Sequence, residues 1–295
     1  MREAKVSYHA GHSGDFCDHA RDTKQLLVEA YLQKAFTHVG IVEHIPPHND
    51  NFLYDEEIKN GHNALFLMER FDDYLTHARK QIQKTFDNQL HLLFGFETEF
   101  YGQKPLERIT ELVNKYQPDF IVASVHHVHD IPIDYSHDQY QKAAEKAGGI
   151  EALYINYYDH QFDLVQHLSS YVDSGMPVII GHFDLIKLLS FSYNPTKAVR
   201  EKMLRNIKKA IECGCVFEVN ARAFKKGLGE PYPGVEILKD IARLGGKVTL
   251  GDDSHAVSEI GLFYEKILPI VKTFFNEITV FEKQGDTVNT LQLSL

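Results

Sequence analysis

The chain has 295 residues, of which 43% are hydrophobic and 24% charged, and this size and composition suit one globular α/β barrel or two smaller domains. No Pro- or Ser-rich linker, low-complexity tract or fixed-period repeat marks a boundary, so we expect a single domain over residues 1–295. The net charge of −10, without a block of Lys and Arg, argues against a nucleic-acid partner. No apolar run approaches the roughly 20 residues that a membrane helix needs, which predicts no membrane association and a cytoplasmic location.

Seven short apolar or β-branched runs predict strands. In chain order they are Lys5–His9, Thr37–Glu43, His91–Glu97, Phe120–His126, Pro177–His182, Val216–Asn220 and Lys247–Gly251. Longer segments between and after them predict helices, at Asp22–Phe36, Ala64–Phe86, Leu106–Tyr116, Glu151–Val172, Lys197–Glu212, Val235–Leu244 and Val257–Thr273. Strand, crossover and helix in repeated order predict a parallel (β/α) barrel with its active site at the C-terminal rim of the strands. Because an eighth run, Ile278–Glu282, carries no site-type residue, we expect the barrel to be seven-stranded or distorted.

Histidines and carboxylates recur at the ends of these apolar runs. They are His9, His12 and His19, then Glu43 and His44, Glu97 and Glu99, His126 and His127, His182 and Asp184, and Asp252, Asp253 and His255. The C-terminal ends of barrel strands meet at one rim, and neutral imidazole is the commonest side-chain ligand for zinc and similar ions. The pattern therefore predicts a multinuclear metal site, although the first three histidines taken alone also fit a solvated polar loop.

These segments also carry a family resemblance. The sequence YHAGHSGDFCDH at residues 8–19 resembles the first motif of the polymerase and histidinol phosphatase (PHP) superfamily, in its histidinol-phosphatase branch. IVEH at 41–44, GFE at 95–97, GHFDL at 181–185 and DDSH at 252–255 agree with later motifs. ASVHHV at 123–128 and GLGEPYP at 227–233 are similar to the fungal form of histidinol-phosphate phosphatase. The resemblance runs in order over roughly residues 6–270.

The resemblance implies a metal-dependent phosphomonoesterase that converts L-histidinol phosphate to L-histidinol and phosphate in histidine biosynthesis. It implies nine ligands for two or three divalent ions, with Glu97 bridging two of them. These ligands are His9, His12, His19, His44, Glu97, His126, His182, Asp253 and His255. A mixed His and carboxylate set fits Zn, Mn or Fe, which the sequence does not separate. Glu43, Asp252 and His127 are expected either to hydrogen-bond ligand imidazoles or to be ordinary polar residues.

The spacing of the first two histidines departs from the family pattern. The family places them two residues apart, whereas His9 and His12 are three apart. Successive side chains of a strand point to opposite faces, so this spacing would direct one ring away from the site. A bulge at Ala10-Gly11 would restore the facing, because an inserted residue shifts the alternation by one. The alternative is that His9 turns away and is not a ligand.

Phosphate-monoester hydrolysis is among the slowest uncatalysed reactions, so a lone general base is not sufficient. We expect a metal-activated hydroxide to attack phosphorus in line, with no covalent intermediate. Glu97, Asp253 and His255 are the expected catalytic residues. Asp253, His255 and a metal-bound water are the candidates that protonate the leaving alkoxide.

The substrate phosphate also needs cationic partners in the protein. Lys225 stands where the resemblance places a phosphate-binding Arg, Arg222 lies close by, and Lys187 is a weaker candidate. Any of the three also fits a solvated surface charge.

Two alternative functions stay open at this point. The first is enzymatic: a PHP phosphoesterase acting on another small phosphomonoester, or a metal-dependent deaminase. The second is a catalytically silent metal-binding protein. The sequence does not indicate an oligomeric state.

The remaining histidines and the cysteines carry no predicted role. His91 and five other histidines outside the motifs lack ligand partners at suitable spacing and are expected at the surface or its boundary. The three cysteines do not suggest a disulfide framework, and Cys213 and Cys215 are expected to be buried apolar residues.

Overall fold

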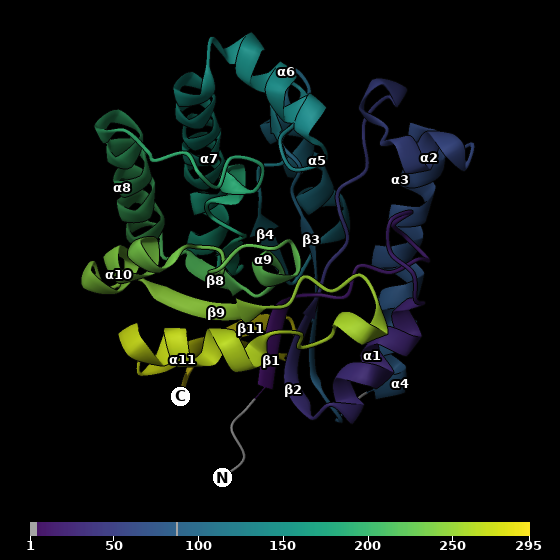
Figure 1. Ribbon diagram of the computed structural model, residues 1–295. Helices are drawn as coiled ribbons and strands as arrows, with labels where there is room; N and C mark the ends of the chain where they lie inside the picture. Colours follow the sequence, from purple (N-terminus) through teal and green to yellow (C-terminus); the bar gives the residue numbers. More distant parts are fainter. Residues whose placement is uncertain (1–4, 87) are drawn as a thin grey trace.

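The structure is a computed structural model that describes residues 5–86 and 88–295. Seven parallel strands form a nearly closed barrel in it (Figure 1). In sheet order they are β1 (Lys5–Ala10), β2 (Phe36–Ile41), β3 (His91–Glu97), β4 (Phe120–Ala123), β7 (Val178–Ile180), β8 (Val216–Asn220) and β9 (Lys247–Gly251). Next to β9, the N–H of Asp253 donates to the carbonyl of His9 over 2.8 Å. This bond joins the first and last strands, and the predicted seven-stranded (β/α) barrel is confirmed.

Helices cover the outside of the barrel, with α1 and α4 on one side and α7 and α8 on the other (Figure 1). The helices are α1 (Lys24–Gln33), α2 (Asp55–Lys59), α3 (Ala64–Asp73), α4 (Arg79–Phe86), α5 (Pro105–Tyr116), α6 (His137–Ala147), α7 (Ile150–Asp173), α8 (Lys197–Glu212), α9 (Arg222–Lys225), α10 (Val235–Arg243) and α11 (Tyr264–Phe274). None of the helices described is long and apolar enough to span a membrane.

Two predicted helices differ from the structure. The one predicted over Ala64–Phe86 is interrupted by a π-helical turn at Tyr74–Ala78. There the buried Tyr74 hydroxyl lies 2.9 and 2.8 Å from the carbonyl oxygens of Ile41 and Gly95, so it ties the turn to the barrel wall. The helix predicted from Val257 begins only at Tyr264. It cannot begin earlier because Gly261 and Phe263 have φ of 67° and 64°, outside the helical range.

The eighth apolar run forms β10 (Glu277–Gln284), which pairs antiparallel with β11 (Thr287–Ser294) rather than joining the barrel. This hairpin lies at the N-terminal ends of the barrel strands. The Tyr8 hydroxyl donates to the carbonyl of Phe281 over 2.7 Å, and the Lys283 ammonium lies 2.6 Å from the Asp119 carboxylate just before β4. A second, two-residue ribbon, β5 (His127–Val128) with β6 (Ile131–Pro132), follows β4. The C-terminal rim is therefore left open for a site.

Close packing inside the barrel determines which side chains face that rim. A Cβ on Gly40 would lie 2.7 Å from the rings of both Phe120 and Tyr8, and one on Gly95 would overlap the Phe120 carbonyl. Gly95 therefore faces the barrel interior. Because side chains alternate along a strand, Glu97 at the end of β3 faces the interior as well.

The substitution Gly95→Ala tests this packing. It is expected to lower the free energy of unfolding by about 1–3 kcal/mol, because the added methyl must displace backbone. Gly229→Ala is the matched control, since a Cβ there meets no atom within 4 Å, and it should change stability by less than about 0.5 kcal/mol. Urea unfolding followed by circular dichroism measures both, and equal stability of the two variants would contradict the packing argument.

Candidate metal centre

The buried carboxylate of Glu97 lies at the centre of the rim and is surrounded by imidazoles. Glu97 is only 1% exposed. Five ring nitrogens approach its two oxygens: at Oε1, His182 Nε2 at 2.8 Å and His126 Nε2 at 3.1 Å, and at Oε2, His9 Nε2 at 3.1 Å, His44 Nδ1 at 3.3 Å and His12 Nε2 at 3.4 Å. Side chains from β1, β3 and the segments after β2, β4 and β7 thus meet at one point, as the sequence predicts.

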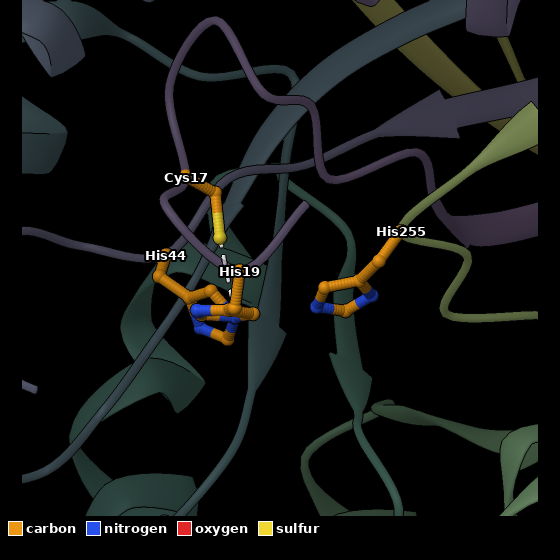
Figure 2. A group of neighbouring side chains, drawn as sticks. All are labelled: Cys17, His19, His44 and His255. Atoms are coloured by element: carbon orange, nitrogen blue, oxygen red, sulfur yellow. Dashed lines mark hydrogen bonds between the residues drawn. The ribbon is translucent and has the colours of Figure 1, made fainter. Parts of the chain in front are cut away.

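The other predicted ligands form a second group beside the first. His19, His44 and His255 place ring nitrogens within 4.8 Å of one another and of the Cys17 sulfur. Figure 2 shows the sulfur directed at the ring of His19, where Sγ lies 3.1 Å from Nε2, while the His255 ring lies on the other side of His19. Cys17 is a buried donor that the sequence analysis missed, although its place two residues before His19 was a usable signal.

His9 faces the centre despite its unusual spacing from His12. The register between β1 and β2 shifts between Ser7 and Ala10, so that three steps along β1 match two along β2. The extra residue lies just before the predicted position at Ala10-Gly11, and Gly11 follows with φ of 67°. An irregularity in β1 is therefore present, but the predicted position at Ala10-Gly11 is wrong, and there the chain turns at Gly11 after the end of β1. His9 and His12 both point inward, with their Nε2 atoms 3.3 Å apart.

The donor atoms are arranged as a divalent cation requires. Both oxygens of Glu218 lie 3.1 Å from His9 Nδ1, so that nitrogen donates, and in the neutral ring the lone pair of Nε2 faces His12 and Glu97. Asp134 fixes His126 in the same way, 3.0 Å from its Nδ1. A carboxylate buried among such nitrogens needs positive charge, which either protons on the imidazoles or a divalent cation between the donors can supply.

The electrostatics of the centre favour an ionised carboxylate. Burial alone would raise the pKa of Glu97, but the neighbouring charges of His9, His44 and His126 outweigh burial and hold this pKa well below its ordinary value. Burial also lowers the pKa of His19 to about 3, with His44 and His12 acting in the same direction, so the His19 ring is neutral and able to coordinate.

Sequence reasoning missed Glu218 and Asp134, which orient ring nitrogens from outside the donor set. Glu218 was detectable as the one charged residue inside the otherwise buried strand β8, where its carboxylate also accepts from the His182 N–H over 2.9 Å. Asp134 lies in the segment after β6, in the sequence IPIDY at 131–135, which also resembles the fungal form but did not indicate a role for this carboxylate. Its position depends on the short β5–β6 ribbon, which the sequence analysis did not anticipate.

Three residues expected to support ligand imidazoles have different outcomes. Glu43 lies 3.7 Å from His12 Nδ1 and also accepts from Ser13. Asp252 bonds the hydroxyls of Ser7 and Tyr31 and the N–H of Gly261, and His127 lies against Glu99. Of the two alternatives, support of a ligand imidazole therefore fits Glu43 alone, because Asp252 bonds Ser7, Tyr31 and Gly261, and His127 contacts Glu99.

A cavity of about 290 Å³ opens beside the two donor groups. Arg222 and Lys226 line it, whereas the two predicted lysines do not: Lys225 pairs with Glu259, and Lys187 pairs with Asp184 and Glu230. Arg222 is held in place because its Nη1 donates to the carbonyl of Asp253 over 2.5 Å and lies 3.1 Å from Glu259. Lys226 was not predicted.

The cavity lining also carries acidic and aromatic side chains. They are Glu56, Glu99, Asp134, Tyr54, Tyr135 and Tyr232. The Tyr54 hydroxyl donates to Glu99 over 3.2 Å, and the Tyr135 hydroxyl donates to Glu56 over 3.1 Å. The cavity therefore presents both cationic and anionic side chains together with the Glu97 carboxylate and its surrounding imidazoles.

Comparison with known proteins gives one consistent result. The model of the PHP domain family matches residues 8–222. A Schizosaccharomyces pombe protein named probable histidinol-phosphatase is 37% identical over 265 residues, which cover 88% of this chain and 83% of that protein. The Saccharomyces cerevisiae histidinol-phosphatase is 25% identical over 294 residues, covering 88% and 86% respectively.

A solved structure has the same fold. Histidinol phosphate phosphatase from Lactococcus lactis, complexed with Zn, L-histidinol and phosphate, superimposes with a TM-score of 0.69. The two sequences are 19% identical, and the match covers 97% of this chain and 98% of the other.

The orienting role of Glu218 can be tested without altering a candidate ligand. Glu218→Gln retains the shape of the side chain but removes its charge, and it is expected to weaken metal binding by about 10–100-fold, as loss of a partner to a ligating imidazole typically does. Competition with a chromogenic chelator measures the affinity. Glu277→Gln, at an exposed position at the start of β10, is the control, and equal affinities in the two variants would refute the role.

Proposed function

The chain belongs to the PHP domain family, and from this membership and the geometry of the site we propose that it is a metal-dependent phosphomonoesterase that hydrolyses L-histidinol phosphate to L-histidinol and phosphate. The observation that carries the proposal is the cavity that combines the Glu97 centre with Arg222 and Lys226 and with the carboxylates Glu56, Glu99 and Asp134. The substrate carries a phosphate as well as an ammonium and an imidazole, so the lining offers partners for both kinds of charge. The cytoplasmic location, the single domain and the oligomeric state stay predictions.

We assign the metal ions to the two donor groups. His9, His12, His126, His182, Asp253 and the shared Glu97 would hold ions in the first group. His19, His44 and His255 would hold a further ion in the second, with Cys17 beside it. Two or three ions of Zn, Mn or Fe suit these donors, and the sulfur favours zinc at the second group. When bound, such ions lower the pKa of water and neutralise phosphoryl oxygens.

The protein's own contribution begins with positioning the phosphate. Arg222 offers a planar fork of donors suited to phosphoryl oxygens, and its Asp253 and Glu259 contacts fix the guanidinium before substrate arrives. Lys226 adds a second positive charge to the cavity lining. Lys225, by pairing with Glu259, supports Arg222 indirectly.

The carboxylates of the cavity lining are suited to the cationic part of the substrate. Burial raises the pKa of Glu99, but the charges of His126 and His44 outweigh it and lower this pKa to about 2, so Glu99 stays ionised and can attract a cationic ligand. Asp134 is ionised for the same reason, since His126 lowers its pKa against the effect of burial. The Tyr54 and Tyr135 rings, with centroids 5.5 Å apart, provide flat surfaces beside these carboxylates.

Proton transfer to the leaving alkoxide needs a donor, and two expected candidates are poorly suited. Burial and the charge of Arg222 hold the pKa of His255 well below its ordinary value. Burial raises the pKa of Asp253, but Arg222 and His9 outweigh it and lower this pKa far below its usual range. Neither group carries an acidic proton at neutral pH. We therefore assign Asp253 and His255 to positioning and metal binding, and the departing oxygen takes its proton from water.

Two observations argue against a silent metal-binding protein. His9 faces the centre, and the cavity has its arginine at Arg222 although Lys225 stands at the family's Arg position. A deaminase would not need the two positive charges of Arg222 and Lys226 in the cavity lining. The cavity alone does not exclude another small phosphomonoester that carries a cation.

Phosphate release from L-histidinol phosphate by the purified protein tests the proposal. Turnover is expected to vanish when a chelator removes the metal and to return when Zn or Mn is added back, because the proposed reaction depends on metal ions to activate water. Elemental analysis of the same sample provides the control. Bound metal without phosphate release would contradict the proposed substrate, and a panel of phosphomonoesters would then separate a different substrate from an inactive fold.

A pair of substitutions tests the phosphate contact. Arg222→Ala is expected to reduce kcat/KM for L-histidinol phosphate by about 10–100-fold, as loss of a hydrogen bond between charged groups worth ~1.5–3 kcal/mol implies. Lys225→Ala should change kcat/KM by less than about threefold, since its ammonium faces Glu259 rather than the cavity. Steady-state kinetics on metal-loaded samples measure both, and the reverse ranking would return the phosphate contact to Lys225.

A further inference from the structure

A second set of metal-type ligands lies at the opposite end of the barrel from the Glu97 centre. His38 of β2 and His91 of β3 are direct partners in the parallel register. Their rings stack with centroids 4.5 Å apart and planes inclined by 14°. Glu282 of β10 reaches both, with Oε1 3.0 Å from His38 Nε2 and 3.6 Å from His91 Nε2. Two imidazoles and a carboxylate from three strands therefore converge on one point.

The hydrogen bonds around His38 are compatible with a lone pair at this point. The Thr37 hydroxyl lies 3.3 Å from the carbonyl of Lys5 and 2.8 Å from His38 Nδ1. When it donates to Lys5 it accepts from Nδ1, and Nε2 of the neutral ring then presents its lone pair toward Glu282. In this tautomer the lone pair and the carboxylate repel one another unless a cation lies between them.

A proton is a weak candidate for that cation. Burial lowers the pKa of His38, and His91 lowers it further, against the opposing effect of Glu282. The neighbouring lysine is also engaged elsewhere, because Lys283 lies 2.6 Å from Asp119. A divalent cation satisfies all three donors at once.

We propose that His38, His91 and Glu282 bind a divalent transition-metal ion, most suitably Zn²⁺, at a site separate from the catalytic centre. Two ring nitrogens and one carboxylate oxygen are a common protein contribution to a zinc site, and water completes the coordination. His91 is 51% exposed and lies at the open side, which gives the ion an entry path. The exposure of His91 agrees with its predicted surface position, but the sequence did not reveal its partners.

The position of this site indicates a structural role. Its ligands connect the two barrel strands β2 and β3 to the hairpin β10–β11, which lies across the N-terminal end of the barrel. Residues at this end of (β/α) barrels serve stability rather than chemistry. Bound metal would therefore fix the hairpin to the barrel and raise the resistance of the folded chain to unfolding.

The test compares the metal content of whole protein variants dialysed at a fixed low free Zn²⁺ concentration. His91→Ala is expected to bind about one equivalent of zinc less than the wild-type chain and to lose the rise in Tm that added Zn²⁺ gives the wild type. His77→Ala is the matched control, because its side chain is 80% exposed and its ion-pair partner is Asp73 on the same helical segment. The control should retain both the equivalent and the response of Tm to zinc.

Activity separates this proposal from the catalytic one. Phosphate release by metal-loaded His91→Ala should stay within about twofold of wild type, because His91 lies away from the catalytic centre. The zinc content and the Tm response do not depend on enzyme activity, so a failure of the proposed function would leave these two measurements valid. Equal zinc content in His91→Ala and wild type would overturn the second site. So would loss of the same equivalent in His77→Ala, which would show non-specific binding by surface histidines.

Discussion

Everything at the rim depends on one buried carboxylate that needs positive charge around it. Glu97 is approached by five imidazoles that come from four strand ends, and a carboxylate so placed is costly to bury unless positive charge surrounds it. The barrel provides this arrangement because parallel strands end at one edge, and alternation along β3 sends Glu97 inward two residues after the packed Gly95. Strand β3 thus contributes both the central carboxylate of the site and a close packing contact inside the barrel.

The surrounding structure holds this crowded group in place. Lys24 is fully buried and pairs with Glu43, and it also donates to the carbonyl of Gly11, which anchors the loop that carries His12 and Cys17. At other strand ends the backbone itself is strained: His182 and Asp253 adopt φ of 20° and 48°. Non-glycine residues rarely adopt such angles and do so mainly where function fixes them. The favourable free energy of packing the apolar core in this way offsets the cost of holding polar groups close together that would otherwise repel one another.

The sequence was informative wherever a residue's role depended on its own strand, and uninformative where it depended on a neighbour. The seven strands and the nine converging donors follow from period, spacing and family motifs. Strand β4, however, ends at Ala123 rather than His126 because the N–H of Ser124 donates to the Thr98 hydroxyl, a contact between residues distant in sequence. Lys225 and Lys226 are a similar case: adjacent positions at the end of α9 point about 100° apart, so a shift of one residue changes which lysine lines the cavity.

The two ends of the barrel show why partner residues from outside a motif are the hardest to predict. Glu218 orients His9, and Glu282 completes the His38 and His91 pair, yet neither belongs to a segment with a recognisable ligand spacing. In each case a carboxylate settles the tautomer or the charge of an imidazole brought to it by the sheet register. At the rim that arrangement surrounds a substrate cavity, whereas at the base it joins a hairpin to two strands. A histidine and carboxylate pair can therefore belong to a catalytic site or to a structural contact, depending on the residues beside it. Which of the two it is depends on the fold rather than on any local sequence.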